Sequence, residues 1–216
     1  DLLDTAYPKM DKNYMHGLGI ISLAYPIKGS GGNVQVDLML QDDIDFARLE
    51  ILKLLAEDDR MKVRVFEDYS NLHAIEKADF LITYTCDVRP TLEQQRVLKD
   101  YVSSGNRWLA LHGTNSILQF MSDGKVDSPR IAPVMMETLG SQFIAHPPIE
   151  PYKVNVVQPD HPLVEGVEEF ETTDELYLME LHGDLDVLLE ADYDGKAEGF
   201  VEEDWPQETW PVFYSK

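Results

Sequence analysis

The stretch DFLITYTCDVRPTLEQQRVLKDYVSSGNRWLALHG, residues 79–113, decides the fold class of this chain. Its first part, DFLITYT, is an apolar run of the length and composition that is typical of a buried strand. The next part begins near Pro90, carries apolar residues at helical spacing and stops at Gly105, which predicts a helix. NRWLALH (106–112) is again an apolar strand. A strand, a helix and a strand in this order predict parallel strands joined by a crossover helix.

The same alternation of strands and helices reaches back to residue 33. VQVDLML (34–40) and MKVRVFED (61–68) have the pattern of strands, and DDIDFARLEILKLLAED between them has helical spacing. Asp42 or Asp43 is the expected N-cap of that helix, and a short helical turn is expected over residues 70–77. These elements predict an α/β fold, an open three-layer arrangement with a mostly parallel sheet. The apolar faces of the two longer helices are expected to comprise Ile44, Ala47, Ile51, Leu54 and Leu55 in the first and Leu92, Val97, Leu98 and Tyr101 in the second.

The two ends of the chain follow other patterns. Residues 1–32 carry aromatic residues and glycines without a clear period and close with GSGG, so we expect a loosely packed N-terminal extension. Residues 33–216 are expected to form one domain, because 216 residues with 44% hydrophobic content suffice for one sizeable core and are too few for two typical domains. Beyond about residue 140, short strands are predicted that extend the sheet or lie across its end. They are residues 152–158, 175–179, 186–192 and 209–215.

The composition limits the partners and the compartment. The 40 acidic residues against 18 basic ones give a formal net charge of -22. A surface this negative repels phosphate backbones and anionic lipids, so neither nucleic acid nor a membrane is expected as a partner. The single cysteine, Cys86, excludes an internal disulfide, and no apolar run is long enough to span a membrane. We therefore expect a cytoplasmic protein, and the exposed edge of an open sheet is compatible with a homodimer.

A histidine follows the strand NRWLALH where the chain is expected to turn sharply. His112 and Gly113 precede a segment, Thr114 to Phe120, that we interpret as the first turns of a helix. Ligands of open parallel sheets bind at the carboxyl ends of the strands, where Thr85 also lies after the preceding strand. The turn LHGT resembles a nucleophile elbow, in which the glycine relieves crowding. An imidazole there suits a general base, a metal ligand or a binding donor better than a covalent nucleophile.

Three further stretches place a histidine or a carboxylate beside a proline or an aromatic residue. They are FIAHPP with His146, PDHPLVEG with Asp160 and His161, and TDELYLMELHG with Asp174, Glu175, Tyr177 and His182. None has the spacing of a standard zinc motif, so no cofactor is expected, with a divalent metal as the weaker alternative. The aromatic rings of Tyr84, Tyr177 and Trp205 can stack on a sugar, although packing in the core is the more frequent role of such rings.

Four blocks of the sequence, taken in order, resemble the trehalose-utilisation (ThuA-like) family, a branch of the class I glutamine-amidotransferase-like superfamily. The blocks are ADFLITYT, the helix and strand that end in WLALHGTNS, LGSQFIAHPP, and VVQPDHPLVEGVEEFETTDELY, and the resemblance covers roughly residues 33 to 216. It implies a flavodoxin-like three-layer sandwich. It also implies that the elbow cysteine of the superfamily is replaced by His112, so that glutaminase chemistry is not available. Cys86 lies one strand earlier and is not a substitute for that cysteine.

The resemblance also implies a set of site residues. His112, His146 and Glu175 are expected to be catalytic. The residues expected to bind the substrate are Thr85, Gly113, Thr114, His161, Asp174 and Tyr177. For His161 a structural role is equally expected, because it precedes a proline in a predicted turn.

The expected function is carbohydrate catabolism, because the family is associated with the use of a disaccharide. An imidazole and a carboxylate can move a proton next to the carbonyl of a sugar or keto-sugar, or activate a water. Two departures favour an alternative, a non-catalytic module that binds a sugar or a partner. The first strand leads into LMLQDDIDF, with Asp42 and Asp43 where members commonly have a glycine-rich loop with a histidine, and the family usually continues beyond FYSK. A third interpretation is metal-assisted hydrolysis by His112, His146 and a carboxylate.

Overall fold

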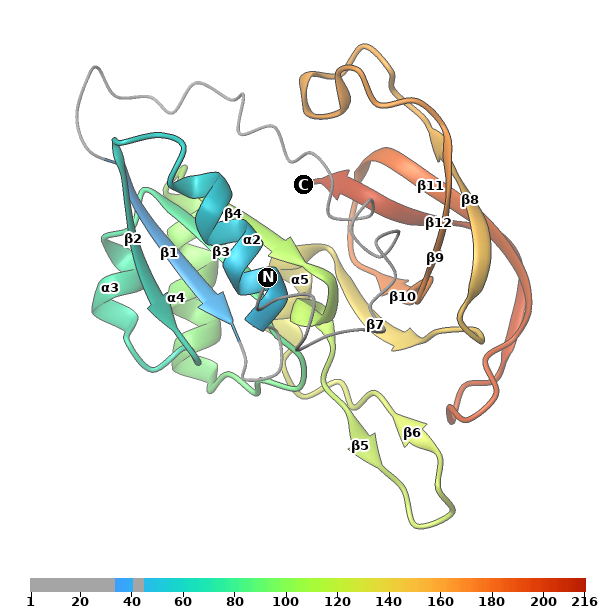
Figure 1. Ribbon diagram of the computed structural model, residues 1–216. Coiled ribbons are helices and arrows are strands. Elements are labelled where there is room, and N and C mark those ends of the chain that lie inside the picture. Colours follow the sequence, from blue (N-terminus) through green and yellow to red (C-terminus); the bar gives the residue numbers. More distant parts are fainter. Residues whose placement is uncertain (1–33, 41–44) are drawn as a thin grey trace, which may run out of the picture. The chain divides into compact units, whose positions relative to one another are not determined.

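The computed structural model describes residues 34–40 and 45–216, which divide into two compact units (Figure 1). The first, the α/β unit, holds the described residues up to Ile144 together with Met179–Asp184. The second, the β unit, holds Ala145–Leu178 and Leu185–Lys216. The predicted extension over residues 1–32, the predicted cap at Asp42 or Asp43, and Ile44 lie outside the described residues.

The α/β unit is built on a four-stranded parallel sheet in the order β2-β1-β3-β4. The strands are β1 (Val34–Leu40), β2 (Met61–Phe66), β3 (Phe80–Tyr84) and β4 (Arg107–Leu111). In the register, Leu38 of the central strand β1 lies between Val65 of β2 and Ile82 of β3. The predicted parallel α/β sheet is confirmed.

Four helices connect the strands of the α/β unit or follow them. They are α2 (Asp45–Leu55), α3 (Leu72–Glu76), α4 (Leu92–Ser103) and α5 (Pro133–Leu139). The chain steps from β1 to β2 in one direction and then back across β1 to β3. Because such crossovers are right-handed, α2 lies on one face of the sheet and α3 and α4 lie on the other, as Figure 1 shows. The predicted three-layer arrangement is therefore present. No helix of the residues that the structure describes is long and apolar enough to cross a membrane.

The core of the α/β unit fills the space between the sheet and the helices α3, α4 and α5. Burying a large apolar side chain contributes about 1.5–3 kcal/mol, so this cluster supplies much of the stability of the unit. Its members are Met39, Tyr69, Ile75, Ala78, Leu81, Leu98, Tyr101, Ile117, Ala132, Met135 and Met136.

The apolar face predicted for α2 is right in part. Ala47 and Leu55 are buried and Ile51 is half-buried, so the buried face follows a spacing of four residues. The prediction that Leu54 belongs to this face is wrong, since 45% of the residue is exposed. It precedes Leu55 by one residue, and one residue turns the helix by about 100°, which carries Leu54 off the buried face.

The prediction of the apolar face of α4 is confirmed at Leu98 and Tyr101, which are buried. It is wrong at Leu92, which lies in the first turn and is 50% exposed. The side chain that is buried instead is Gln95. Its Nε2 donates to the carbonyl of Pro90 at 3.1 Å, and its Oε1 accepts from two backbone N–H groups at the start of α5. A buried amide therefore joins α4 to α5, a role that an apolar side chain cannot take.

The predicted helix after β4 is wrong. The chain makes a single 3₁₀ turn, η2 (His112–Asn115), and then enters a hairpin of β5 (Gln119–Phe120) and β6 (Val126–Asp127). The cause lies in the loop after β3. There the N–H of Asp87 donates to the carbonyl of Ser116 at 2.9 Å, and the Asp87 carboxylate accepts the N–H of Leu118 at 3.0 Å. These bonds hold the segment extended against the neighbouring loop, so the helix cannot continue.

The strands after residue 140 do not extend the parallel sheet. β7 (Ser141–Ala145) pairs with β10 (Leu178–Leu181), so the strand predicted over residues 175–179 begins three residues later. The β unit has a four-stranded antiparallel sheet of its own in the order β12-β11-β8-β9. Its elements are β8 (Glu150–Val156), the 3₁₀ turn η3 (Pro162–Val164), β9 (Phe170–Asp174), β11 (Asp186–Lys196) and β12 (Asp204–Ser215).

Candidate functional site

The turn at the carboxyl end of β4 forces a residue with a side chain into a strained conformation. His112 has φ of 45°, and Asp87 after β3 has φ of 54°; among the described residues these are the non-glycine residues with positive φ. Such conformations cost about 1–3 kcal/mol and cluster at functional sites. The strain therefore marks the loop ends after β3 and β4 as the candidate site of the α/β unit.

Gly113 allows the turn to pack against the end of β3. A Cβ at this position would lie 2.5 Å from the carbonyl oxygen of Thr85 and 3.0 Å from the Cβ of Cys86. No side chain fits within those distances, so the glycine is needed for a close backbone approach. The crowding that the LHGT pattern predicts is present, but it arises at the neighbouring strand end rather than at a following helix.

Buried hydroxyl groups fix the turn to the two strands. The Oγ1 of Thr114 lies 2.9 Å from the carbonyl of Leu111 and 3.0 Å from the carbonyl of Thr83. Thr83 Oγ1 in turn accepts the indole N–H of Trp108 at 2.9 Å. Thr114 and Thr85 are both buried. These contacts show Thr114 supporting the turn, and the predicted substrate contacts of Thr85, Gly113 and Thr114 stay predictions.

The side chain of His112 is exposed at this edge of the sheet. The ring of Tyr84 lies against it edge to face, with 5.7 Å between the ring centroids. The imidazole is thus presented to solvent from a backbone that is tightly held. That arrangement suits a group that meets a ligand, as the carboxyl ends of parallel strands usually do.

A second candidate site lies in the β unit, where the structure brings together His146 and Glu175. His146 follows β7 and Glu175 follows β9, and His146 Nε2 is 3.7 Å from Glu175 Oε1. The other ring nitrogen, Nδ1, lies 2.7 Å from the carbonyl of Pro147. The ring of Phe200, in the β11–β12 connection, meets the imidazole edge to face at 4.9 Å. The two side chains remain 25% and 29% exposed, so a ligand can reach both.

Asp174 and the half-buried phenol of Tyr152 lie near this pair. The carboxylate of Asp174 accepts the N–H of Glu175 at 2.8 Å, which orients the residue that follows β9. Burial, with a smaller contribution from the Asp174 carboxylate, raises the pKa of Tyr152 well above its usual range. Tyr152 therefore stays neutral beside the acidic side chain. Tyr177 is half-buried after Glu175, and its predicted role in binding a substrate stays a prediction.

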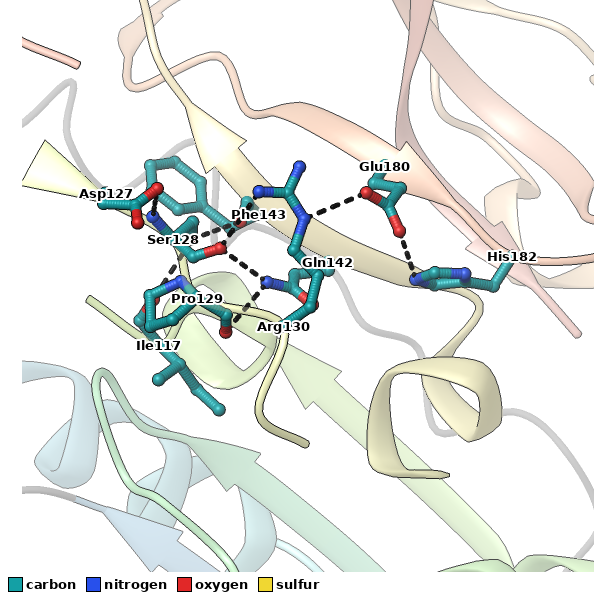
Figure 2. A network of polar contacts seen from close by, with 9 residues as sticks. All are labelled: Ile117, Asp127, Ser128, Pro129, Arg130, Gln142, Phe143, Glu180 and His182. Carbon is teal, nitrogen blue, oxygen red and sulfur yellow. Dashed lines mark hydrogen bonds and ion pairs between the residues drawn. The ribbon is translucent and has the colours of Figure 1, made fainter. Parts of the chain in front are cut away.

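His161 and His182, the other two histidines of the stretches singled out in the sequence, each have contacts of their own. His161 is the N-cap of η3, where its Nδ1 accepts the N–H of Leu163 at 3.2 Å, so its structural interpretation has a direct contact in support. His182 Nε2 lies 3.6 Å from Glu180 Oε1, and the other carboxylate oxygen of Glu180 accepts from Arg130 at 3.1 Å. Figure 2 shows the contacts of Glu180, whose carboxylate lies between Arg130 and His182 within the α/β unit.

Sequence reasoning missed three residues of these sites. Asp87 shapes the elbow, Phe200 packs on the imidazole of His146, and Asn115 donates to Ser141 Oγ at 2.7 Å, tying the turn to β7. The tripeptide Asp-Val-Arg before Pro90 carried a signal for Asp87, because aspartate tolerates positive φ and accepts local backbone bonds. No local pattern marks Phe200, whose contact depends on the long β11–β12 hairpin.

A divalent metal was the weaker alternative predicted from the sequence, and the structure shows no cluster of metal ligands in residues 34–40 and 45–216. Within these ranges, no group of three or more histidine, cysteine, aspartate or glutamate side chains is placed to hold a metal ion.

The parallel sheet and the sharp turn after β4 define the class of protein, a three-layer α/β fold with an imidazole at the turn, which is consistent with the class I glutamine-amidotransferase-like superfamily. Within that superfamily the chain belongs to the trehalose-utilisation (ThuA) family, whose profile matches residues 39–215. No curated protein gives a significant match to the chain.

A solved structure with a TM-score above 0.5 supports the same fold, and two others match with lower TM-scores. A ThuA-like protein from Bacteroides uniformis matches with a TM-score of 0.66 and 17% identity, over 88% of this chain and 81% of that chain. The mmIFT52 N-terminal domain matches with a TM-score of 0.49 and 14% identity, over 76% of this chain and 82% of its own. A protein described as a component of GMP synthase, from Thermoplasma acidophilum, has a TM-score of 0.43 and 10% identity, over 84% and 81%.

Proposed function

We propose that the protein is an enzyme of sugar catabolism that moves a proton on a sugar or keto-sugar, with His146 as the base and Glu175 as its acidic partner. The observation that carries this proposal is the 3.7 Å separation of His146 Nε2 and Glu175 Oε1, both partly exposed. Membership in the trehalose-utilisation family supports a carbohydrate as the substrate.

The geometry around His146 suits a base. A backbone carbonyl accepts only from an N–H, so the 2.7 Å contact to Pro147 fixes the tautomer with its proton on Nδ1. The lone pair of the neutral ring is then on Nε2, on the side of Glu175. When Nε2 accepts a proton the ring becomes cationic, and the carboxylate of Glu175 supplies the compensating charge. The ring of Phe200 packs edge to face against the imidazole of His146 and restrains its orientation.

The proposed step needs no redox partner. On a keto-sugar, the proton on the carbon next to the carbonyl passes to His146 Nε2, and the electron pair of the broken C–H bond moves onto the carbonyl oxygen. An isomerisation is completed when the hydroxyl proton on the carbon that lost its C–H proton moves to the former carbonyl oxygen, and His146 returns its proton to the former carbonyl carbon. An elimination is completed when the electron pair returns from the oxygen and expels a hydroxyl or alkoxyl group from the next carbon, which leaves with the proton from His146. We do not assign glutaminase activity, because the elbow carries the imidazole of His112 in place of a thiol.

A thermal-shift screen and turnover assays test this proposal. Trehalose, glucose and their 3-keto derivatives are screened with the wild type, His146→Gln and Glu175→Gln, and His73→Gln, an exposed histidine on α3, is the matched control. We expect a sugar to raise the melting temperature, and we expect turnover to be lost in both site variants but kept in the control. Full turnover by His146→Gln would overturn the assignment.

The same screen separates the enzyme from a non-catalytic module. A sugar that raises the melting temperature of the wild type without being converted would favour the binding module. His112→Ala is assayed separately, because His112 belongs to the α/β unit. Loss of turnover in this variant, with the fold intact, would give the elbow a part in the same reaction.

A further inference from the structure

One face of the antiparallel sheet in the β unit, which we call the aromatic face, leads from the core to the candidate site (Figure 1). Residues that pair directly in a ladder point to the same face of a sheet, and the face alternates along each strand. The middle of the aromatic face is buried, at Val154, Ala191 and Trp210. Its end is at Asp174, which directly precedes Glu175. The pairings assign to this face Glu150, Tyr152 and Val154 of β8, Thr172 and Asp174 of β9, Ala191, Tyr193 and Gly195 of β11, and Trp205 and Trp210 of β12.

A β-bulge in β12 brings two indoles to the aromatic face. Trp205 and Trp210 are five residues apart (210 minus 205), and an odd spacing places side chains on opposite faces of a regular strand. Tyr193 pairs with Glu208 while Gly195 pairs with Trp205, so a step of two residues in β11 faces a step of three in β12. The extra residue returns Trp205 to the face of Trp210, and their rings meet edge to face with centroids 5.2 Å apart.

The indole of Trp205 is held in a fixed orientation and is still partly open to solvent. Its Nε1 donates to the carbonyl of Glu202 at 2.9 Å, and the buried ring of Trp210 supports it. Trp205 itself is half-buried. Opposite it, a Cβ at Gly195 would lie 2.8 Å from the hydroxyl of Tyr193, so the phenol extends along β11 to the position that faces Trp205. A ring restrained in this way is preorganised to contact a ligand.

The same end of the aromatic face adjoins the catalytic pair of the proposed function. The connection between β11 and β12 carries Phe200, whose ring packs on the imidazole of His146 at 4.9 Å. Burial raises the pKa of Tyr193, and the carboxylate of Glu150 adds to that rise, which places Glu150 near the phenol. Glu150 pairs directly with Asp174, the residue before Glu175. Aromatic rings and carboxylates therefore gather beside the candidate base.

The charges of this region favour an uncharged ligand. Residues 190–208 contain eight acidic residues and one basic residue, Lys196, which pairs with Asp204 at 3.0 Å. Such a surface repels phosphate and carboxylate groups, whereas its carboxylates accept hydrogen bonds from hydroxyl groups. The negative face of an indole attracts the partly positive C–H bonds on the face of a sugar ring.

The arrangement of the two indoles separates a sugar from a cation. Aromatic rings also attract cations, and a cage for a cation turns several ring faces toward one centre. Trp205 and Trp210 instead meet edge to face, at an interplanar angle of 79°, so they do not enclose a common centre. A single ring face suits a flat ligand.

We propose that Trp205 is the residue that stacks on a ring of an uncharged sugar bound beside His146 and Glu175. The proposal rests on the proposed function, and it adds the residue that holds the sugar and excludes sugars that carry a phosphate or a carboxylate. The indole packs on the C–H face of the ring, and hydroxyl groups at the edge of the ring donate to carboxylates of the aromatic face.

Indole resonances test the proposal without any need for turnover. The three tryptophans give three indole N–H signals in the NMR spectrum of the ¹⁵N-labelled protein, and Trp205→Phe assigns the signal of Trp205. The probes are trehalose, glucose, trehalose 6-phosphate and choline. We expect trehalose or glucose to shift the Trp205 signal to saturation, and we expect trehalose 6-phosphate and choline to leave it in place at the same concentration.

Calorimetric titrations with the same uncharged sugar compare variants. Trp205→Ala is expected to weaken binding about tenfold. The matched control is Tyr214→Ala, which truncates a half-buried aromatic side chain at the other end of β12 and is expected to keep the affinity of the wild type. Wild-type affinity in Trp205→Ala would overturn the proposal. So would a Trp205 signal that neither uncharged sugar moves, or one that choline or the phosphorylated sugar moves equally.

His146→Gln separates this proposal from the proposed function. We expect this variant to lose turnover while the sugar still shifts the Trp205 signal, because stacking does not depend on the base. Full turnover by His146→Gln would overturn the proposed chemistry and leave the stacking role of Trp205 in place. Turnover that is lost in His146→Gln but unchanged in kcat and KM in Trp205→Ala would overturn the stacking role alone.

Discussion

Replacing Gly113 by alanine tests whether the elbow depends on a close backbone approach. A glycine outside the left-handed region, as Gly113 is, ordinarily gains stability when it becomes alanine, because the unfolded chain loses freedom. At Gly113 the added methyl group would stand 2.5 Å from the carbonyl oxygen of Thr85 and 3.0 Å from the Cβ of Cys86. Thr85 directly follows β3, a strand that is paired on both sides, so its carbonyl has little freedom to rotate away. The strand end or the turn must therefore move.

The two effects have opposite signs and known sizes. The gain from reduced freedom of the unfolded chain is about 0.4–1 kcal/mol. Extra atoms in a well-packed site cost typically about 1–3 kcal/mol. The contact with Thr85 is shorter than real Cβ contacts, which places the cost toward the upper part of that range. We expect Gly113→Ala to lower the free energy of unfolding of the α/β unit by about 2 kcal/mol.

Urea denaturation measures this change. Trp108 is the tryptophan of the α/β unit and lies on β4, beside the turn, whereas Trp205 and Trp210 belong to the β unit. Fluorescence in a Trp205→Phe, Trp210→Phe background therefore follows the elbow. The control is Gly124→Ala, because Gly124 has positive φ but open space around it, so that the substitution strains only the tip of the β5–β6 hairpin. Unchanged or increased stability of Gly113→Ala would refute the argument.

Three further predictions concern the strained His112, the buried amide of Gln95 and the half-buried phenol of Tyr152. His112→Gly is expected to be about 1 kcal/mol more stable to urea than His112→Ala, because both remove the imidazole and only alanine has a Cβ at φ of 45°; equal stabilities would show that the backbone relaxes. Gln95→Leu is expected to cost about 2 kcal/mol, since it leaves buried N–H groups of α5 without an acceptor, and a loss below about 0.5 kcal/mol would contradict this. The raised pKa of Tyr152 means that the phenol ionises in the unfolded chain before it does so in the folded one. Its contribution is present below about pH 10 and is lost above that value, so Tyr152→Phe is expected to flatten the fall in unfolding free energy at alkaline pH; an unchanged fall would contradict the assignment.

The fold of the α/β unit could be predicted because its signals are local. Hydrophobic runs of five to seven residues and the helix that begins after Pro90 and stops at Gly105 all lie within one stretch of chain. The predictions that Leu54 and Leu92 are buried were wrong because the face of a helix was assigned incorrectly at these positions. One residue along a helix moves a side chain to another face. The strands after residue 140 could not be assigned to a sheet from their patterns, because partner choice in an antiparallel sheet depends on long-range pairing.

The candidate site, like the fold, could be predicted only in part. His112, His146 and Glu175 were expected to be catalytic, and the structure brings two of the three, His146 and Glu175, to 3.7 Å within one unit. The geometry on which we base the proposed role of His146 could not be predicted. It depends on the carbonyl of Pro147 and on the ring of Phe200, which is 54 residues further along the chain (200 minus 146). Contacts of that range leave no periodic pattern in the sequence.

Asp87 explains why the sharp turn at His112 and the β5–β6 hairpin occur together. Its backbone N–H holds the carbonyl of Ser116, directly after the 3₁₀ turn, and its carboxylate holds the N–H of Leu118, directly before β5. The same carboxylate forms an ion pair with Arg89 at 2.9 Å. One aspartate therefore prevents the turn at His112 from continuing as a helix and directs the following chain into the β5–β6 hairpin. The left-handed conformation of Asp87, at φ of 54°, is the local cost of this arrangement, and aspartate tolerates that conformation better than most residues with a side chain. The strain next to His112 and the position of the β5–β6 hairpin thus have a common physical cause in the loop after β3.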